Sequence, residues 1–128
     1  MAKKVIFVDD SRTILATVEM ATEELVESGV IEFATYENPA LFLEKIQSGE
    51  ESYDLLFTDL NMPQMSGLDL SKELKAMDNY KMKPILALTT ESSPEIKAQG
   101  KAIGITGWIV KPFSDAKIVG AIKKLLGV

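Results

Sequence analysis

The sequence contains neither cysteine nor histidine. Without cysteine, the chain can form no disulfide bond and no thiolate metal site. Without histidine, it has no imidazole ligand or imidazole base, which excludes every Ser-His and Cys-His catalytic arrangement. Any metal site must therefore be built from oxygen ligands, and any nucleophile must be activated by groups other than histidine.

The chain also lacks an apolar run of transmembrane length, and no signal-peptide core follows Met1-Ala2-Lys3-Lys4. Its net charge is −5, from 14 basic and 19 acidic residues, a balance that disfavours nucleic-acid binding. The 128 residues are 46% apolar and 26% charged, as in one globular domain. We therefore expect a cytoplasmic protein with a single domain, residues 1–128, that binds neither membrane nor nucleic acid.

Short apolar segments alternate with amphipathic ones along the whole chain. Five segments have the length and composition of buried strands, and they end near Val8, Ala34, Asp59, Leu88 and Val110. Each is followed by apolar residues at helical spacing, and the first of these helices is expected to run unbroken from Ser11 to Gly29. Strict alternation predicts an α/β fold in which helices cover both faces of a parallel sheet.

Polar residues stand where these predicted strands end. Asp9 and Asp10 follow the first strand, Asp59 ends the third, Thr89 the fourth, and Lys111 follows the fifth. If the strands are neighbours, these side chains share one edge of the sheet, and three carboxylates there repel one another unless a cation lies among them. Oxygen ligands favour Mg²⁺. A carboxylate, a metal, a lysine and a hydroxyl are the parts that phosphoryl transfer to Asp59 requires.

Each residue taken alone also fits an ordinary turn, helix cap or strand end, so the joint pattern carries the argument. Four motifs together resemble the receiver domain of two-component response regulators: Val8-Asp9-Asp10-Ser11, Thr58-Asp59-Leu60-Asn61-Met62-Pro63, Leu88-Thr89 and Val110-Lys111-Pro112-Phe113. The resemblance covers the whole chain, with every motif in order. It implies a flavodoxin-like, doubly wound (βα)5 fold with a five-stranded parallel sheet in the order 2-1-3-4-5.

The resemblance also implies a role for each site residue. Asp59 would be the phospho-acceptor, taking a phosphoryl group from a phosphohistidine on a partner histidine kinase. Mg²⁺ would be bound directly by Asp10 and Asp59, by the backbone carbonyl of Asn61, and through water by Asp9. Lys111 would pair with the phosphoryl group, and the Lys111-Pro112 peptide bond would be cis.

A conformational switch is implied as well. Thr89 would move toward the phosphoryl oxygens and Trp108 would follow as the coupled aromatic. The surface formed by the fourth helix, the fifth strand and the fifth helix would respond. Thr90 and Glu91 would control access to Asp59. In many members of the family the switch aromatic is Tyr or Phe, so Trp108 is bulkier than usual, and Thr90 stands where Ala, Ser or Gly is common. Gly100 weakens the nearby helix by about 1 kcal/mol relative to alanine, which we interpret as mobility.

Among single-domain regulators, the resemblance is closest to CheY-like chemotaxis proteins, through Thr89-Thr90-Glu91 and Gly107-Trp108-Ile109-Val110-Lys111-Pro112-Phe113. The implied partners are a chemotaxis histidine kinase, a flagellar motor switch protein or other protein target, and a phosphatase. We expect a monomeric signalling protein rather than an enzyme. Since no output domain follows the last predicted helix, the signal is expected to leave by protein contact.

Two alternatives within this family stay open: a phosphorelay intermediate, and a binding module that works without phosphorylation. A haloacid-dehalogenase-like phosphatase would carry a second aspartate where this chain has Asn61. A flavin or nucleotide carrier would need a glycine-rich phosphate loop in place of Asp9-Asp10-Ser11. Both of these other classes are disfavoured by the sequence.

Overall fold

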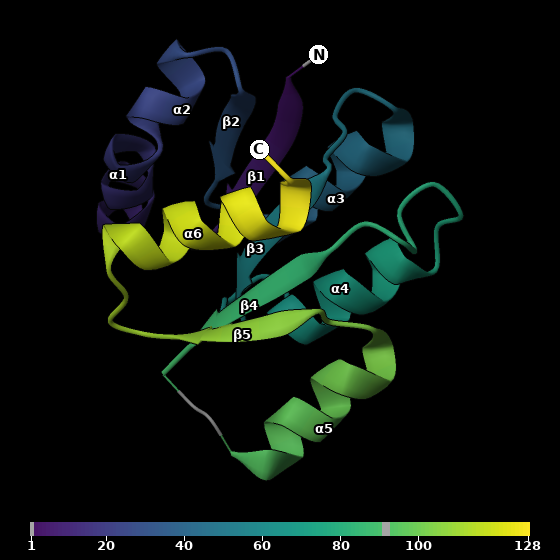
Figure 1. Ribbon diagram of the computed structural model, residues 1–128. Helices are drawn as coiled ribbons and strands as arrows, with labels where there is room; N and C mark the ends of the chain where they lie inside the picture. The colour runs from purple at the N-terminus through teal and green to yellow at the C-terminus, as the bar shows by residue number, and fades with distance from the viewer. Residues whose placement is uncertain (1, 91–92) are drawn as a thin grey trace.

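A computed structural model describes residues 2–90 and 93–128 of the chain (Figure 1). Its centre is a five-stranded sheet in which all neighbouring strands are parallel, in the order β2-β1-β3-β4-β5. The strands are β1 (Lys3–Val8), β2 (Ile31–Tyr36), β3 (Leu55–Asp59), β4 (Ile85–Thr89) and β5 (Gly107–Val110). The predicted flavodoxin-like α/β fold and its strand order are confirmed.

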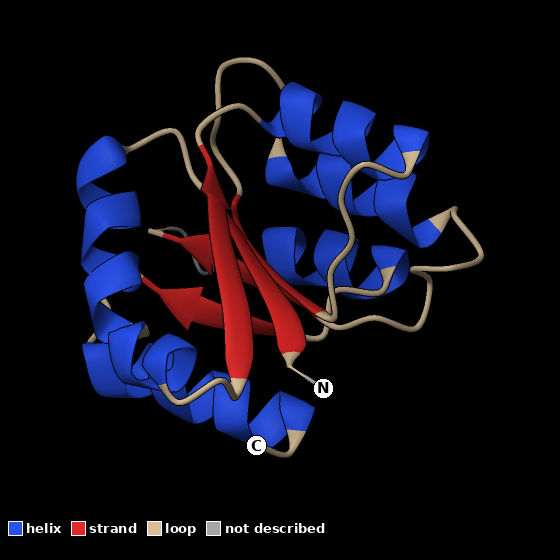
Figure 2. Ribbon diagram, turned by 90° about the horizontal axis from the view of Figure 1, so that it is seen from above, coloured by secondary structure: helices blue, strands red, loops and turns tan. Residues whose placement is uncertain are grey.

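Within the described residues, six helices connect the strands and form a layer on each face of the sheet (Figure 2). They are α1 (Arg12–Ala21), α2 (Glu23–Glu27), α3 (Pro39–Ser48), α4 (Gly67–Lys75), α5 (Pro94–Ile103) and α6 (Asp115–Leu126). The apolar core on one face includes side chains of α1 and α6, and the core on the other face includes side chains of α3 and α4. No helix within the described residues has the length and apolarity needed to cross a membrane.

The first predicted helix differs from the structure, because Thr22 divides it into α1 and α2. Thr22 is buried, and its hydroxyl donates hydrogen bonds to the carbonyl oxygens of Val18 (2.9 Å) and Glu19 (3.2 Å). A threonine that bonds back to the preceding turn competes with the helical hydrogen bonds and bends the helix. The apolar spacing therefore gave the correct buried face but did not reveal the break.

The second strand also extends further than predicted. Thr35 and Tyr36 continue β2 beyond Ala34, since they pair in register with Phe7 and Val8 of β1. Their polar groups made this end of the strand look like a loop in the sequence. The helix that follows begins after Asn38, whose side-chain oxygen accepts hydrogen bonds from two backbone N–H groups of α3.

Strands β1, β3 and β4 lie inside the sheet and are buried on both faces. Val5 to Val8 and Leu55 to Phe57 have no exposed surface, which explains their nearly continuous apolar sequence. Because every strand runs in the same direction, all five carboxyl ends open on one edge. The strand order reverses at β1 and β3, so the residues that follow these two strands lie side by side at the position where open α/β sheets place their functional sites.

Candidate functional site

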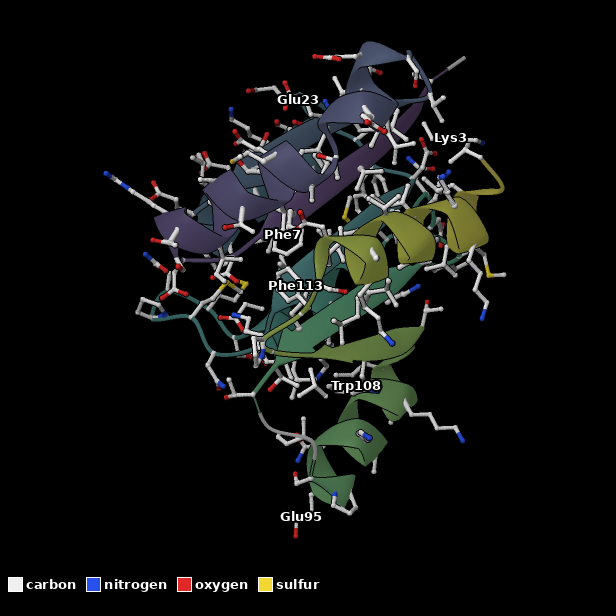
Figure 3. The ribbon with its side chains drawn as sticks, turned by 60° about the vertical axis from the view of Figure 1, so that its left-hand side comes forward. Lys3, Phe7, Glu23, Glu95, Trp108 and Phe113 are labelled. Atoms are coloured by element: carbon white, nitrogen blue, oxygen red, sulfur yellow. The ribbon has the colours of Figure 1, made fainter. Side chains whose placement is uncertain are left out.

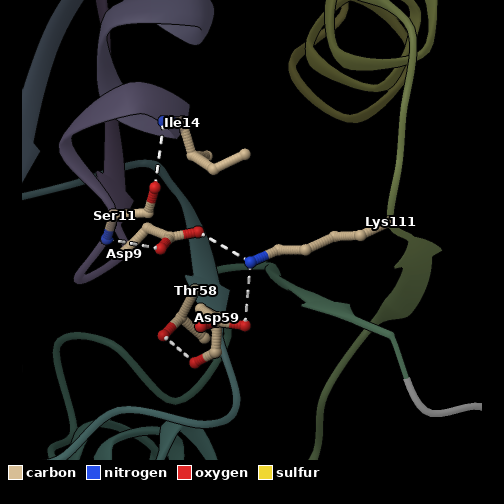
Figure 4. Close-up of polar contacts among 6 residues, drawn as sticks. All are labelled: Asp9, Ser11, Ile14, Thr58, Asp59 and Lys111. Carbon is tan, nitrogen blue, oxygen red and sulfur yellow. Dashed lines mark hydrogen bonds and ion pairs between the residues drawn. The ribbon is translucent and has the colours of Figure 1, made fainter.

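Two aspartates and a lysine meet at this edge (Figure 4). The Nζ of Lys111 lies 2.9 Å from Oδ2 of Asp9 and 3.2 Å from Oδ1 of Asp59. Asp9 is fully buried and Asp59 is 7% exposed, so this is a largely water-excluded ion cluster. The three residues come from the ends of β1, β3 and β5, which brings together the residues predicted from the strand ends.

The backbone around the cluster holds each side chain in place. The N–H of Asp9 donates to the carbonyl of Tyr36 at 3.1 Å, and the N–H of Lys111 donates to the carbonyl of Thr89 at 3.0 Å. The second oxygen of Asp9, Oδ1, accepts a 2.9 Å hydrogen bond from the N–H of Ser11. Ser11 in turn caps α1, since its hydroxyl accepts from the N–H of Ile14 at 3.3 Å.

The peptide bond between Lys111 and Pro112 is cis, as the family resemblance implied. Immediately before it, Val110 pairs in register with Thr89 at the end of β4. Lys111 therefore leaves the sheet just beyond this pair. Its long side chain extends back across the strand ends to the two aspartates (Figure 4).

The charges in the cluster shift one another's protonation. Burial raises the pKa of the Asp59 carboxyl group, and the negative charge of Asp9 raises it further, while the Lys111 cation offsets only part of this increase. Burial alone would lower the pKa of the Lys111 ammonium group. The hydrogen bond and charge of Asp9, together with the charge of Asp59, outweigh burial, so the pKa of Lys111 lies above its usual range.

Asp10 completes a group of carboxylates with the composition of a cation site. One oxygen each from Asp9, Asp10 and Asp59 lies within 4.8 Å of the other two, and Asp10 is exposed to solvent. Three carboxylates and one lysine leave a charge of −2 when all are ionised. Clustered hard oxygen donors with this charge fit a divalent cation such as Mg²⁺. Asn61, the other predicted ligand, lies two residues beyond Asp59 and is exposed.

Gly67 supports the site in a way that the sequence did not reveal. It is buried at the start of α4, and its N–H donates to the carbonyl of Leu60 at 2.9 Å. A Cβ atom added at this position would collide with the carbonyl oxygen of Asp59, which also accepts a 2.9 Å hydrogen bond from the hydroxyl of Thr58. The sequence Ser66-Gly67 indicates a turn, but only the fold shows that Asp59 lies against it.

One predicted switch residue, Thr89, lies at the same edge of the sheet as the cluster, whereas Trp108 lies further back on β5. Thr89 ends β4 and is 2% exposed, whereas Thr90 is exposed next to it. Trp108 lies opposite Ala87 in the register between β5 and β4, and it packs against the core on the α5 side of the sheet. Glu91, predicted to control access, lies outside the described residues.

Comparisons with known proteins give a consistent result. The family model described as the response regulator receiver domain matches residues 5–123. The chemotaxis protein CheY1 of Helicobacter pylori J99 is 32% identical over 124 residues, which are 97% of each chain. The chemotaxis protein CheY of Pseudomonas aeruginosa PAO1 is 30% identical over 95% of this chain and 94% of its own.

Among solved structures, the chemotaxis response regulator CheY4 of Vibrio cholerae is similar to this chain. The two have 37% sequence identity and superpose with a TM-score of 0.85. The match covers 98% of this chain and 99% of the CheY4 chain.

Proposed function

The chain belongs to the response regulator receiver family, and from this premise we propose that it accepts a phosphoryl group on Asp59 in a Mg²⁺-dependent reaction and signals through a protein partner. The observation that carries the proposal is the buried Asp9–Lys111–Asp59 cluster at the carboxyl edge of the sheet. It combines a carboxylate nucleophile, a fixed cation and neighbouring oxygen donors within one small space.

Asp59 is the nucleophile in this proposal. One of its carboxylate oxygens attacks the phosphorus of the donor, and a new P–O bond forms while the donor's P–N bond to histidine, or P–O bond to acetate, breaks. Lys111 is already 3.2 Å from Asp59, so its ammonium group can pair with a phosphoryl oxygen after transfer. Burial and the charge of Asp9 raise the pKa of Asp59 and so disfavour its ionised form, which is the nucleophile. Positive charge near Asp59 counteracts this effect and favours the ionised form.

Mg²⁺ would be held by Asp10 and Asp59 directly, by the backbone carbonyl of Asn61, and by Asp9 through water. When bound, it would neutralise negative charge on the phosphoryl oxygens during transfer. The clustering of the three carboxylate oxygens within 4.8 Å supports the aspartates of this set. The ammonium group of Lys111, 3.2 Å from Asp59, would supply a second positive charge.

Phosphorylation would then change the surface that faces a partner. It adds about −1.5 to −2 of charge next to Lys111 and Thr89, and the Thr89 hydroxyl can donate to a phosphoryl oxygen. Trp108 is the aromatic that would follow Thr89. The first predicted helix is split into α1 and α2, so the fourth and fifth predicted helices are α5 and α6 in the structure. The responding surface would therefore comprise α5, β5 and α6.

The names of the relatives support a role in chemotaxis. The phosphodonor would be a chemotaxis histidine kinase, the target a flagellar motor switch protein or another protein, and a phosphatase would end the signal. We propose that the protein acts in the cytoplasm as a monomeric, single-domain regulator rather than as an enzyme. A phosphorelay intermediate and a phosphorylation-independent binding module remain the alternatives.

A turnover assay tests the proposal. Acetyl phosphate and Mg²⁺ are added to the protein, and the release of inorganic phosphate is followed over time. Steady release is expected from the wild type, none above background from Asp59→Asn, and none from either protein in EDTA. Equal release by wild type and Asp59→Asn would contradict the assignment of Asp59. To test the output, binding to a flagellar motor switch protein is measured with and without acetyl phosphate, and equal affinity would favour the binding-module alternative.

A further inference from the structure

The helix α5 carries a glycine, Gly100, in its interior, where glycine is normally unfavourable. Of the ten residues of α5, all of which the structure describes, Gly100 alone is buried. A Cβ atom at this position would lie 2.7 Å from Cη2 of Trp108, closer still to Cζ2 of the same ring, and 3.3 Å from Cδ1 of Ile105. No residue larger than glycine fits while the Trp108 ring stays where it is.

A second helical glycine shows that this contact is specific. Gly120 lies in the interior of α6, and a Cβ atom there would meet nothing within 4 Å. A side chain would therefore fit at position 120, whereas the Trp108 ring leaves no room for one at position 100. This packing accounts for Gly100 without the mobility that the sequence suggested.

The contact connects α5 to the strand that carries the site. Trp108 lies on β5, three residues before Lys111, and Figure 3 shows it between β5 and α5. The ring atoms that meet Gly100 belong to the six-membered ring of the indole, the part by which tryptophan exceeds the size of phenylalanine. The bulkier aromatic on β5 and the missing side chain on α5 thus form a size-matched pair.

We propose that Gly100 is the positioning residue for Trp108: it forms the socket for the indole ring, and this pair is the latch that holds α5 against the sheet. Ile96 and Ile103 of α5 are partly buried, as Trp108 itself is, whereas the contact of Gly100 with the ring is at the buried residue of this helix. Displacement of the ring therefore releases α5. The link between phosphorylation and this displacement rests on the proposed function. The latch itself, the contact between Gly100 and Trp108, does not depend on that function.

A mutant cycle measured by thermal unfolding tests the latch without any phosphorylation. The variants are Gly100→Ala, Trp108→Phe and the double variant, with Gly120→Ala as the matched control. Gly120→Ala should raise the melting temperature, because alanine favours a helix where there is room for it. Gly100→Ala should lower the melting temperature in the wild type and raise it in the Trp108→Phe background. An increase in both backgrounds, or an equal decrease in both, would overturn the proposal.

Tryptophan fluorescence provides a second measurement, because Trp108 is the only tryptophan in the chain. In Gly100→Ala the methyl group displaces the ring, so the emission should shift to longer wavelength and iodide should quench it more strongly than in Gly120→Ala. Unchanged emission in a folded Gly100→Ala variant would contradict the socket. This measurement remains informative even if the two unfolding temperatures are too close to distinguish.

Acetyl phosphate with Mg²⁺ then links the latch to the signal. The emission of the wild type should change on phosphorylation, whereas Gly100→Ala should take up phosphate at Asp59 with a smaller change in emission. An equal change in emission would show that the latch does not respond to the site. Absence of phosphate uptake by the wild type would instead contradict the proposed function. The opposite effects of Gly100→Ala on the melting temperature in the two backgrounds would still test the contact between Gly100 and Trp108, because that measurement involves no phosphorylation.

Discussion

Replacing Asp59 by asparagine should stabilise the protein in Mg²⁺-free buffer. Asp59 is almost fully buried, and the raised pKa means that its ionised form is disfavoured in the folded state by burial and by the charge of Asp9. A carboxyl group with a raised folded-state pKa binds its proton more tightly in the folded than in the unfolded protein. Stability attributable to it is therefore greatest at low pH and is lost as pH rises through the folded-state pKa, leaving a penalty at neutral pH.

The geometry gives the approximate size of this penalty. With an effective dielectric constant of about 20, like charges no more than 4.8 Å apart repel by at least roughly 3.5 kcal/mol, so Asp9 and Asp10 each oppose the charge on Asp59. The Lys111 cation at 3.2 Å attracts it by roughly 5 kcal/mol. Because Asp10 is exposed and screened, the balance of these charges lies between roughly 1.5 kcal/mol of attraction and roughly 2 kcal/mol of repulsion, and the cost of burying the charge on Asp59 shifts it toward a penalty. Lys111 keeps its 2.9 Å bond to Asp9 in the variant, so no unpaired charge is created.

We therefore expect Asp59→Asn to be more stable by about 1–2 kcal/mol, which corresponds to an increase in melting temperature of roughly 3–8 °C for a domain of this size. Thermal unfolding in EDTA at neutral pH measures the difference. Asp78→Asn is the matched control, since the Asp78 side chain is 95% exposed and its removal should change little. Added Mg²⁺ should then stabilise the wild type more than Asp59→Asn. An unchanged or lower melting temperature for Asp59→Asn in EDTA would refute the reasoning.

Three further predictions concern other parts of the molecule. The Tyr53 hydroxyl is buried with no hydrogen-bond partner among the described residues, so Tyr53→Phe should leave the free energy of unfolding in urea unchanged or raise it by up to about 1–2 kcal/mol, and a clear loss would contradict this. The exposed side chain of Thr90 adjoins the site, so Thr90→Ala should shorten the lifetime of the phosphorylated protein in Mg²⁺ buffer; an unchanged lifetime would show that Thr90 does not hinder access. Burial and the hydrogen bond to Glu51 raise the pKa of Tyr36 to about 12. The free energy of unfolding should therefore decline as the pH rises from about 10 toward 12, because Tyr36 keeps its proton longer in the folded protein than in the unfolded one. In urea unfolding, Tyr36→Phe should show a weaker decline over this pH range than the wild type, and an equal decline would contradict the assignment.

The elements and the main site could be predicted because their signals are local. The apolar runs that end at Asp9, Asp59 and Lys111 identify parallel strands, and parallel strands bring their carboxyl ends to one edge. That β1 and β3 are neighbours came from the family resemblance, since the period of apolar residues gives no strand order. Thr22 was missed because its back-bonding hydroxyl interrupts a helix without disturbing its apolar stripe.

The glycines show where prediction from the sequence fails. Gly67 and Gly100 look like a turn residue and a weak point in a helix. Their reasons lie in segments distant in the chain: the carbonyl of Asp59 for Gly67, and the ring of Trp108 for Gly100. A glycine that makes room for another group leaves no local pattern, because the constraint is the position of that group.

Intact mass spectrometry after incubation with acetyl phosphate and Mg²⁺ tests the central claim most directly. The wild type should gain the mass of one phosphoryl group, the adduct should disappear as the aspartyl phosphate hydrolyses, and Asp59→Asn should gain none under the same conditions. Asp78→Asn, which removes an exposed aspartate, should behave as the wild type does. A phosphoryl adduct on Asp59→Asn equal to that on the wild type, or no adduct on a wild type shown to bind Mg²⁺, would contradict the account.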